Sequence, residues 1–149
     1  MNIKQIDIYL MEMKMKTPFS TSFGTVQNKK FYVVKAIDES GIVGWGEGVA
    51  FEAPWYTEET VETSLHMLEK FLIPLVLHRT IEYPREVDAL FQSIRRNQMA
   101  KASIEGAVWD LYAKLQNKSI SNVIGGTRTA IDVGISIGIE PTIEKQLQV

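Results

Sequence analysis

The sequence predicts an α+β fold in which a three-stranded antiparallel meander precedes several helices. Three observations support this prediction. Residues 6–15 alternate apolar and polar side chains, two further strand-like segments flank a short turn, and apolar residues then recur at helical spacing as far as residue 116. A fourth strand-like segment and the start of another helix follow.

The meander is expected to contain one irregularity. In residues 6–15 the apolar positions are even up to Leu10 and odd after it, and we interpret this phase slip as a β-bulge. Residues 31–37 are rich in β-branched and aromatic side chains and predict the second strand. Residues 38–41 predict the turn that leads into the third strand at residues 42–49.

The first helix is expected to be capped by Thr57 and to carry Glu58 and Glu59 in its first turn, where acidic side chains suit the positive end of the helix. Apolar residues then recur at spacings of three and four along one face. Pro74 is expected to end this helix, because proline interrupts the backbone hydrogen bonds.

Two further helices are predicted, one beginning near Pro84 and one over residues 100–116. Glu105 and Asp110 lie on the latter helix, about 140° apart around its axis. They therefore do not converge on one site, and we expect each to be a structural pairing group.

The last part of the chain predicts the beginning of a second unit. Residues 131–139 alternate Ile or Val with small or polar residues, and a helical pattern begins near Pro141. A parallel strand needs neighbours, so we expect the sequence to stop inside a βα unit and this strand to invite edge pairing. The expected domains are residues 1–99 and residues 100–149, the latter with a linking helix and an incomplete second domain.

Composition excludes several classes of function. Sixteen Lys and Arg stand against eighteen Asp and Glu, for a net charge of −2, and there is no cysteine. Nucleic acid is therefore not an expected partner, and disulfides and thiolate metal sites are excluded. The two histidines lie in separate contexts, which excludes a multi-histidine metal site. No signal peptide or membrane-spanning run is visible, so we expect a soluble, cytoplasmic protein without membrane partners.

The glycines at positions 44, 46 and 48 resemble a phosphate-binding loop only superficially. A dinucleotide fingerprint needs G-x-G-x-x-G between a strand and a helix, and here the spacing differs and no helix follows. We interpret these glycines as positions where the strand bends or another backbone approaches closely.

Two connections are rich in aromatic residues and are candidate binding elements. Residues 17–25, between the first two strands, combine hydroxyls, two phenylalanines and a glycine, and residues 50–56 follow the third strand. Both connections could share one end of the sheet and act as a mobile lid. The alternative is that these rings pack onto the domain itself.

A larger pattern emerges from the third helix onward. Residues 100–114 read AKASIEGAVWDLYAK, followed by SI at 119–120 and VIGG at 123–126. This succession resembles the signature of the enolase superfamily, in its muconate-lactonising and mandelate-racemase-like branch. Within that branch, four segments resemble the o-succinylbenzoate synthase and N-acylamino acid racemase family: PFSTSFGT at 18–25, GWGE at 44–47, WYTEE at 55–59 and ISIG at 135–138.

The resemblance implies an α+β capping domain followed by the first strand of a truncated (β/α) barrel. It also implies abstraction of a proton next to a carboxylate, by lysines and with Mg²⁺ held by carboxylates, all on later barrel strands. No K-x-K motif follows the third helix. We therefore expect no catalytic residue and no metal ligand in this chain, and no activity or Mg²⁺ binding by the chain alone.

The resemblance further implies which residues face a small carboxylate substrate. They are Phe19, Ser22, Phe23, Gly24, Phe51, Tyr56 and Ser136. The implied function of the intact homo-oligomeric enzyme is dehydration to o-succinylbenzoate in menaquinone biosynthesis, or racemisation of N-acylamino acids. The alternative is a stand-alone cap-like binding or interaction domain without catalysis.

Overall fold

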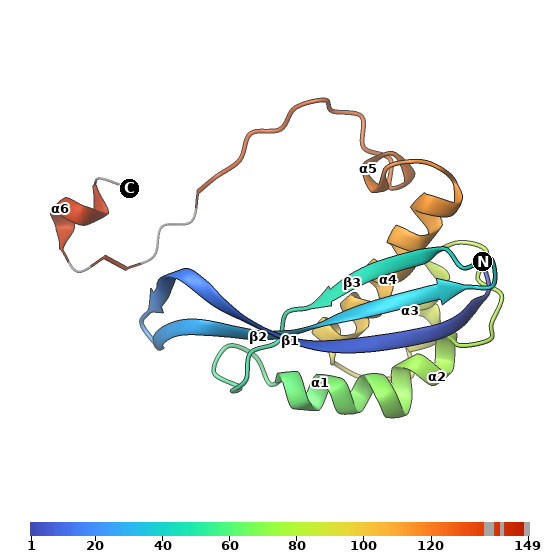
Figure 1. The fold of residues 1–149 in the computed structure, drawn as a ribbon, viewed down its shortest axis with the longest axis horizontal. Helices are drawn as coiled ribbons and strands as arrows, with labels where there is room; N and C mark the ends of the chain where they lie inside the picture. The colour runs from blue at the N-terminus through green and yellow to red at the C-terminus, as the bar shows by residue number, and fades with distance from the viewer. Residues whose placement is uncertain (136–138, 141, 148–149) are drawn as a thin grey trace.

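The computed structural model describes residues 1–135, 139–140 and 142–147. Its centre is an antiparallel sheet with strand order β1 (Ile3–Thr21), β2 (Gly24–Asp38) and β3 (Val43–Gly48), which confirms the predicted meander. Figure 1 shows the long β1–β2 hairpin reaching beyond the rest of the sheet, and the helices of residues 61–115 packed along the sheet, whereas the last two helices of the chain lie apart from it.

The helices follow the sheet in the chain. Their bounds are α1 (Val61–Met67), the π-helical segment η1 (Leu68–Leu72), α2 (Ile73–Val76), α3 (Glu86–Phe91), α4 (Gln98–Leu115), α5 (Ile120–Val123) and α6 (Ile143–Gln146). Among the described residues, no helix combines the length and the apolar character that a membrane crossing requires.

Helix α4 packs directly on β3, because β3 carries glycine where the helix crosses it. A Cβ atom on Gly44 would lie 2.1 Å from the carbonyl oxygen of Ala107, and one on Gly46 would lie 2.0 Å from that of Ser103. Both distances are far shorter than a van der Waals contact, so only glycine fits. This confirms the interpretation for Gly44 and Gly46 as points of close backbone approach, whereas a Cβ on Gly48 would meet the Tyr32 ring instead.

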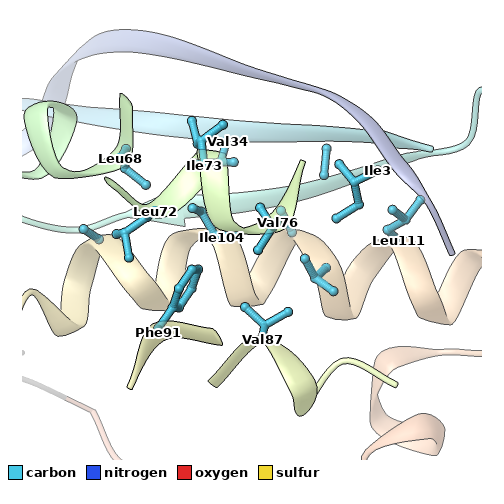
Figure 2. Packing of buried hydrophobic residues seen from close by; sticks show 14 of the residues in the cluster. Ile3, Val34, Leu68, Leu72, Ile73, Val76, Val87, Phe91, Ile104 and Leu111 are labelled. Carbon is cyan, nitrogen blue, oxygen red and sulfur yellow. The ribbon is translucent and has the colours of Figure 1, made fainter. Parts of the chain in front are cut away.

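The hydrophobic core fills the layer between the sheet and the helices, as Figure 2 shows. Its buried members come from β1, β2, the helical segments from α1 to α4 and the connection between α2 and α3: Ile3, Tyr32, Val34, Ala36, Val61, Leu68, Leu72, Ile73, Val76, Ile81, Val87, Phe91, Ala100, Ile104, Ala107, Val108 and Leu111. In β2 the buried residues are the even-numbered ones from Tyr32 to Asp38, so the helices cover this face of the sheet along that half of the strand.

The predicted bulge after Leu10 is wrong. Pairing of β1 with β2 continues without a break from Gln5 to Lys14, and the register shifts lie outside this stretch, between Ile3 and Gln5 and between Lys14 and Phe19. The odd-numbered methionines lie on the outer face of the sheet, where Met11 is 45% exposed and Met13 is 52% exposed. The apparent phase slip arises because this strand carries apolar residues on both faces.

Two predicted helix boundaries are also wrong. The N-cap of α1 is Thr60, whose hydroxyl accepts a hydrogen bond from the Thr63 N–H at 3.2 Å, rather than Thr57. Pro74 lies in the first turn of α2, where its missing N–H leaves no partner unsatisfied, and so the chain remains helical through it.

Of the two acidic residues predicted to pair on α4, one does so. Asp110 accepts hydrogen bonds from the Trp45 N–H at 2.8 Å and from Lys114 Nζ at 2.6 Å, as predicted. Glu105 has no hydrogen-bond or ion-pair partner among the described residues, so that prediction is wrong.

Residues 131–135 do not form the strand that their alternation predicts. Their isoleucine and valine side chains are exposed, because no strand among the described residues lies beside them to pair with them. Ile139 donates its N–H to the Ser20 carbonyl oxygen at 3.4 Å. The proposed boundary between residues 99 and 100 stays a prediction.

Candidate functional site

The tip of the β1–β2 hairpin forms one side of the candidate site. The predicted loop over residues 17–25 is largely strand, and the chain reverses only at Ser22 and Phe23. The Phe23 N–H donates to Thr21 Oγ1 at 3.2 Å, and Gly24 follows with φ of 150°, a value that L side chains rarely adopt. This tight reversal brings Phe19 and Phe23 to one end of the sheet.

The segment between β3 and α1 forms the other side. Its two ends meet, because the Val61 N–H donates to the Phe51 carbonyl oxygen at 2.9 Å and Phe51 pairs with Thr60 as an isolated parallel bridge. The chain between them is thereby closed into a compact loop. We call residues 51–60 the aromatic loop.

Aromatic rings from both sides contact one another. Trp55 lies between Phe51, at a centroid distance of 4.4 Å, and Phe23, at 5.6 Å with the rings nearly stacked. Tyr56 meets Phe51 and Trp55 edge-on, each at 6.2 Å. These offset and edge-to-face geometries are the ones that aromatic quadrupoles favour.

The rings enclose one side of an open cavity of about 520 Å³. Its lining comes from the hairpin tip, from β2, from the aromatic loop with the residues before it, and from the start of α4: Phe19, Thr21, Ser22, Phe23, Lys29, Lys30, Val49, Ala50, Phe51, Trp55, Tyr56 and Met99. We call this cavity the aromatic pocket. Its size and largely apolar lining suit a small molecule with an apolar body.

The structure brings together five of the seven residues that the resemblance assigned to the substrate. Phe19, Ser22, Phe23, Phe51 and Tyr56 all line the aromatic pocket. The two predicted connections therefore share one end of the sheet, and their joint movement as a lid stays a prediction.

The remaining two residues differ. Gly24 lines a neighbouring hollow of about 180 Å³ that shares Thr21, Phe23 and Trp55 with the pocket. Ser136 lies outside the described residues.

Seven lining residues were not among the sequence candidates: Thr21, Lys29, Lys30, Val49, Ala50, Trp55 and Met99. Trp55 stands within a segment already singled out for its aromatic content, so its neighbours could have indicated it. Met99 carried no such signal, because it reaches the pocket from α4, which begins more than forty residues after the aromatic loop starts.

Both lysines of the pocket are paired. Lys29 Nζ lies 2.8 Å from Glu47 Oε1 and 5.0 Å from the centre of the Phe31 ring. Lys30 Nζ lies 2.7 Å from Glu52 Oε1. The hydrogen bond to the Glu52 carboxylate, with its negative charge, raises the pKa of the Lys30 ammonium above its ordinary value.

This lining suits binding rather than proton transfer. The described residues that line the pocket include no carboxylate and no imidazole, and its two lysines are held in ion pairs. In the part of the chain that the structure describes, no group of three or more His, Asp or Glu side chains could hold a metal ion. These residues therefore do not fit a Mg²⁺ site, and the pocket's chemistry is shape, apolar contact and exclusion of water.

Curated relatives match almost the whole chain. An o-succinylbenzoate synthase of Geobacillus stearothermophilus is 52% identical over 148 residues, covering 99% of this chain. An N-succinylamino acid racemase of Thermus thermophilus is 38% identical over 149 residues. In both cases the chain spans only 40% of the relative's length.

A solved structure has the same fold. The crystal structure of an enolase superfamily member from Listeria innocua superposes with a TM-score of 0.92 at 40% identity, over 99% of this chain and 40% of that one. The family model for the mandelate racemase / muconate lactonizing enzyme N-terminal domain matches residues 5–125. The chain therefore belongs to the mandelate racemase / muconate lactonizing enzyme family of the enolase superfamily, with the fold of its N-terminal domain.

Proposed function

We propose that this chain forms the substrate-covering part of an o-succinylbenzoate synthase. The observation that carries the proposal is the aromatic pocket, built jointly by the hairpin tip and the aromatic loop. It occurs in a chain that is 52% identical to a synthase over nearly its full length. The proposed reaction is the dehydration of a cyclohexadiene carboxylate in menaquinone biosynthesis, in the cytoplasm.

In this proposal the pocket acts on the part of the substrate that does not react. Phe19 and Phe51 contact the apolar body of the substrate, and closure of the two elements removes water from it. In the proposed enzyme, the catalytic lysines and the carboxylates that bind Mg²⁺ come from residues other than 1–149. A Mg²⁺ ion held by those carboxylates would supply positive charge against the substrate carboxylate.

A second candidate is racemisation of N-succinylamino acids. The 38% identical Thermus thermophilus racemase, which matches the whole length of this chain, favours it. Both reactions begin with removal of a proton next to a carboxylate, so the same pocket would serve either substrate by holding its remote part.

A chimera tests the proposal. Residues 1–149 replace the matching part of the Geobacillus stearothermophilus synthase, and dehydration and racemisation are assayed separately. We expect dehydration with kcat/KM within about tenfold of the parent enzyme, and a loss of at least about tenfold when the chimera carries Phe51→Ala. A folded chimera that catalyses neither reaction would overturn the enzymatic proposal and favour a binding domain without catalysis.

A further inference from the structure

We propose that Glu59 is a positioning residue that fixes the shape of the aromatic pocket by joining the aromatic loop to the first turn of α4. The inference rests on the proposed function, because it assigns Glu59 a role in holding the pocket for the substrate. It concerns a residue that does not line the pocket itself.

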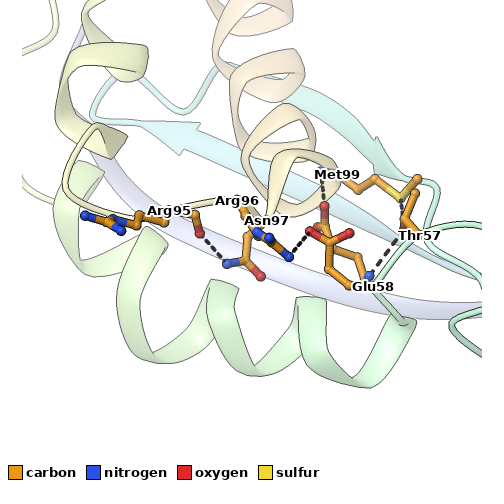
Figure 3. A network of polar contacts seen from close by, with 7 residues as sticks. Thr57, Glu58, Arg95, Arg96, Asn97 and Met99 are labelled. Carbon is orange, nitrogen blue, oxygen red and sulfur yellow. Dashed lines mark hydrogen bonds and ion pairs between the residues drawn. The ribbon is translucent and has the colours of Figure 1, made fainter.

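Glu59 caps a helix to which it does not belong. Its side chain is buried, with 6% exposure, and its two oxygens accept hydrogen bonds from the N–H groups of Met99 and Ala100, each at 3.0 Å. The sequence places Glu59 beside the start of α1, whereas its carboxylate lies at the positive end of α4. Figure 3 shows Met99 at the start of α4 beside Thr57, which lies two residues before Glu59.

Helix α4 lacks a cap of its own. The residue at its N-cap position, Asn97, has φ of 56° and makes no side-chain capping hydrogen bond. Arg96 before it has φ of 55°, so two consecutive non-glycine residues adopt the left-handed conformation. Such backbone persists only where surrounding contacts hold it, and Glu59 supplies the two bonds that a local cap would otherwise supply.

The neighbours of Glu59 reinforce this junction. Thr57 Oγ1 accepts a hydrogen bond from the Glu59 N–H at 3.2 Å and lies 4.0 Å from the Met99 sulfur. Glu58 Oε1 lies 3.7 Å from Arg96 Nη1. Three successive residues of the aromatic loop thus contact the connection into α4, as the dashed lines in Figure 3 indicate.

The junction leads directly to the pocket on both sides. Met99 donates its N–H to the Glu59 carboxylate and lines the pocket from α4. On the other side, Thr60 follows Glu59 and pairs with Phe51, which also lines the pocket. One carboxylate therefore sets the distance between the methionine and the aromatic rings.

A carboxylate suits this position better than any isosteric group. Two N–H donors converge on Glu59, and each oxygen accepts one of them. In Glu59→Gln the amide nitrogen is a donor and opposes one of these N–H groups, so one hydrogen bond is lost while the side-chain shape is kept. Any change in the pocket then reflects the lost bond and charge rather than lost volume.

The first test uses the chain alone. We expect Glu59→Gln to shift the NMR signals of the Met99 methyl group and the Trp55 indole, and to speed exchange of the Met99 and Ala100 amides at least about tenfold. Glu69→Gln is the matched control, because it removes the same charge from an exposed position that lines no part of the pocket. Unchanged Met99 and Trp55 signals in Glu59→Gln would overturn the proposal.

The second test uses the chimera described above, well below its melting temperature. We expect Glu59→Gln to raise KM about tenfold with kcat within about twofold, and Glu59→Ala to do so more strongly if it folds. If Glu59→Gln lowered the melting temperature but left KM unchanged, Glu59 would be a helix cap that affects only stability, and the proposal would be overturned. Failure of the proposed function gives a different result, because the chimera would then lack activity even with Glu59 intact. The NMR test on the chain alone would still decide whether Glu59 positions the pocket.

Discussion

The helix-covered part of the sheet and its aromatic end differ in how closely their atoms are packed. Under α4, the backbones approach so closely that a single Cβ on Gly44 or Gly46 would lie within about 2 Å of a carbonyl oxygen. At the aromatic end, ring centroids are separated by 4.4 to 6.2 Å and Phe23 is 74% exposed.

This difference separates residues that specify the fold from residues free to specify a ligand. A substitution under α4 has no space in which to relax, so its effect falls on folding. A substitution at the aromatic end removes contacts from an open surface, so its effect falls mainly on binding. Substitutions in the two regions, each compared with a matched substitution nearby, should therefore have different effects.

The largest effect is expected from Gly46→Ala. The added methyl group would overlap the Ser103 carbonyl oxygen at 2.0 Å and push α4 away from β3, with a loss of about 3 kcal/mol in the free energy of unfolding. Urea denaturation of the chain measures this loss.

The glycine that faces it on α4 gives the control. A Cβ on Gly106 would meet Gly46 Cα at 3.7 Å, an ordinary contact. Gly106→Ala should therefore stabilise the chain by up to about 1 kcal/mol, because alanine favours the helix. Equal losses from both substitutions would contradict the close packing of β3 on α4.

At the aromatic end, Phe19→Ala and Phe51→Ala should change binding more than folding. Loss of one buried aromatic contact is worth about 2–3 kcal/mol, which corresponds to about 30- to 150-fold in kcat/KM, chiefly through KM. The preference between succinylbenzoate-type and acylamino substrates should change as well. Kinetics and melting temperature are measured on the same preparations of the chimera.

The opposite pattern would show that the rings only hold the domain together. In that case the melting temperature falls strongly while the kinetic constants at low temperature stay those of the unmutated chimera. The pocket assignment would then be abandoned.

Sequence patterns predicted the closely packed region well because its constraints are local. The glycines of β3 and the apolar face of α4 each follow a simple period, and each period implies one packed face. The bulge predicted after Leu10 was wrong because it, too, rested on a local pattern alone. Met11 and Met13 continue an apolar alternation on a face that no helix of the described residues covers, and the pattern alone does not tell the two faces apart.

The aromatic end was predicted in outline only. The aromatic content of two connections indicated a binding surface, and their meeting followed from strand order. The partner of Glu59 could not be predicted, because a carboxylate beside one helix start is equally suited to another helix brought near by the fold. Residues 131–135 were predicted as a strand because their apolar residues alternate. Alternation shows that a segment is suited to a strand, but a strand also needs a neighbouring strand to pair with.

A smaller effect is expected at Asp110, which joins α4 to the edge of β3. Asp110→Ala leaves the Trp45 N–H without its acceptor and removes the bond from Lys114, and should cost about 1–2 kcal/mol in the free energy of unfolding. Glu105→Ala on the same helix should change it by less than about 0.5 kcal/mol, because Glu105 has no partner among the described residues. Comparable losses in urea denaturation would contradict the assignment.

The smallest effect is expected where an exposed ion pair joins β2 to the aromatic loop. The Glu52 carboxylate raises the pKa of Lys30 above 10.5, so the folded chain holds this proton more tightly than the unfolded chain. The stabilisation is therefore complete below pH 10.5 and is lost as the pH rises through the higher pKa of the folded state. Because both side chains are exposed to solvent, Glu52→Gln should leave stability at neutral pH unchanged within error.

The pKa itself is the sensitive measure of this pair. In an NMR titration of the Lys30 side chain, Glu52→Gln should lower the pKa toward its ordinary value, and high salt should lower it in the unmutated chain by screening the two charges. Glu47→Gln, which removes the partner of Lys29 instead, should leave the pKa of Lys30 in place. If the pKa of Lys30 did not change in Glu52→Gln, this ion pair would not help to hold the aromatic loop to the sheet.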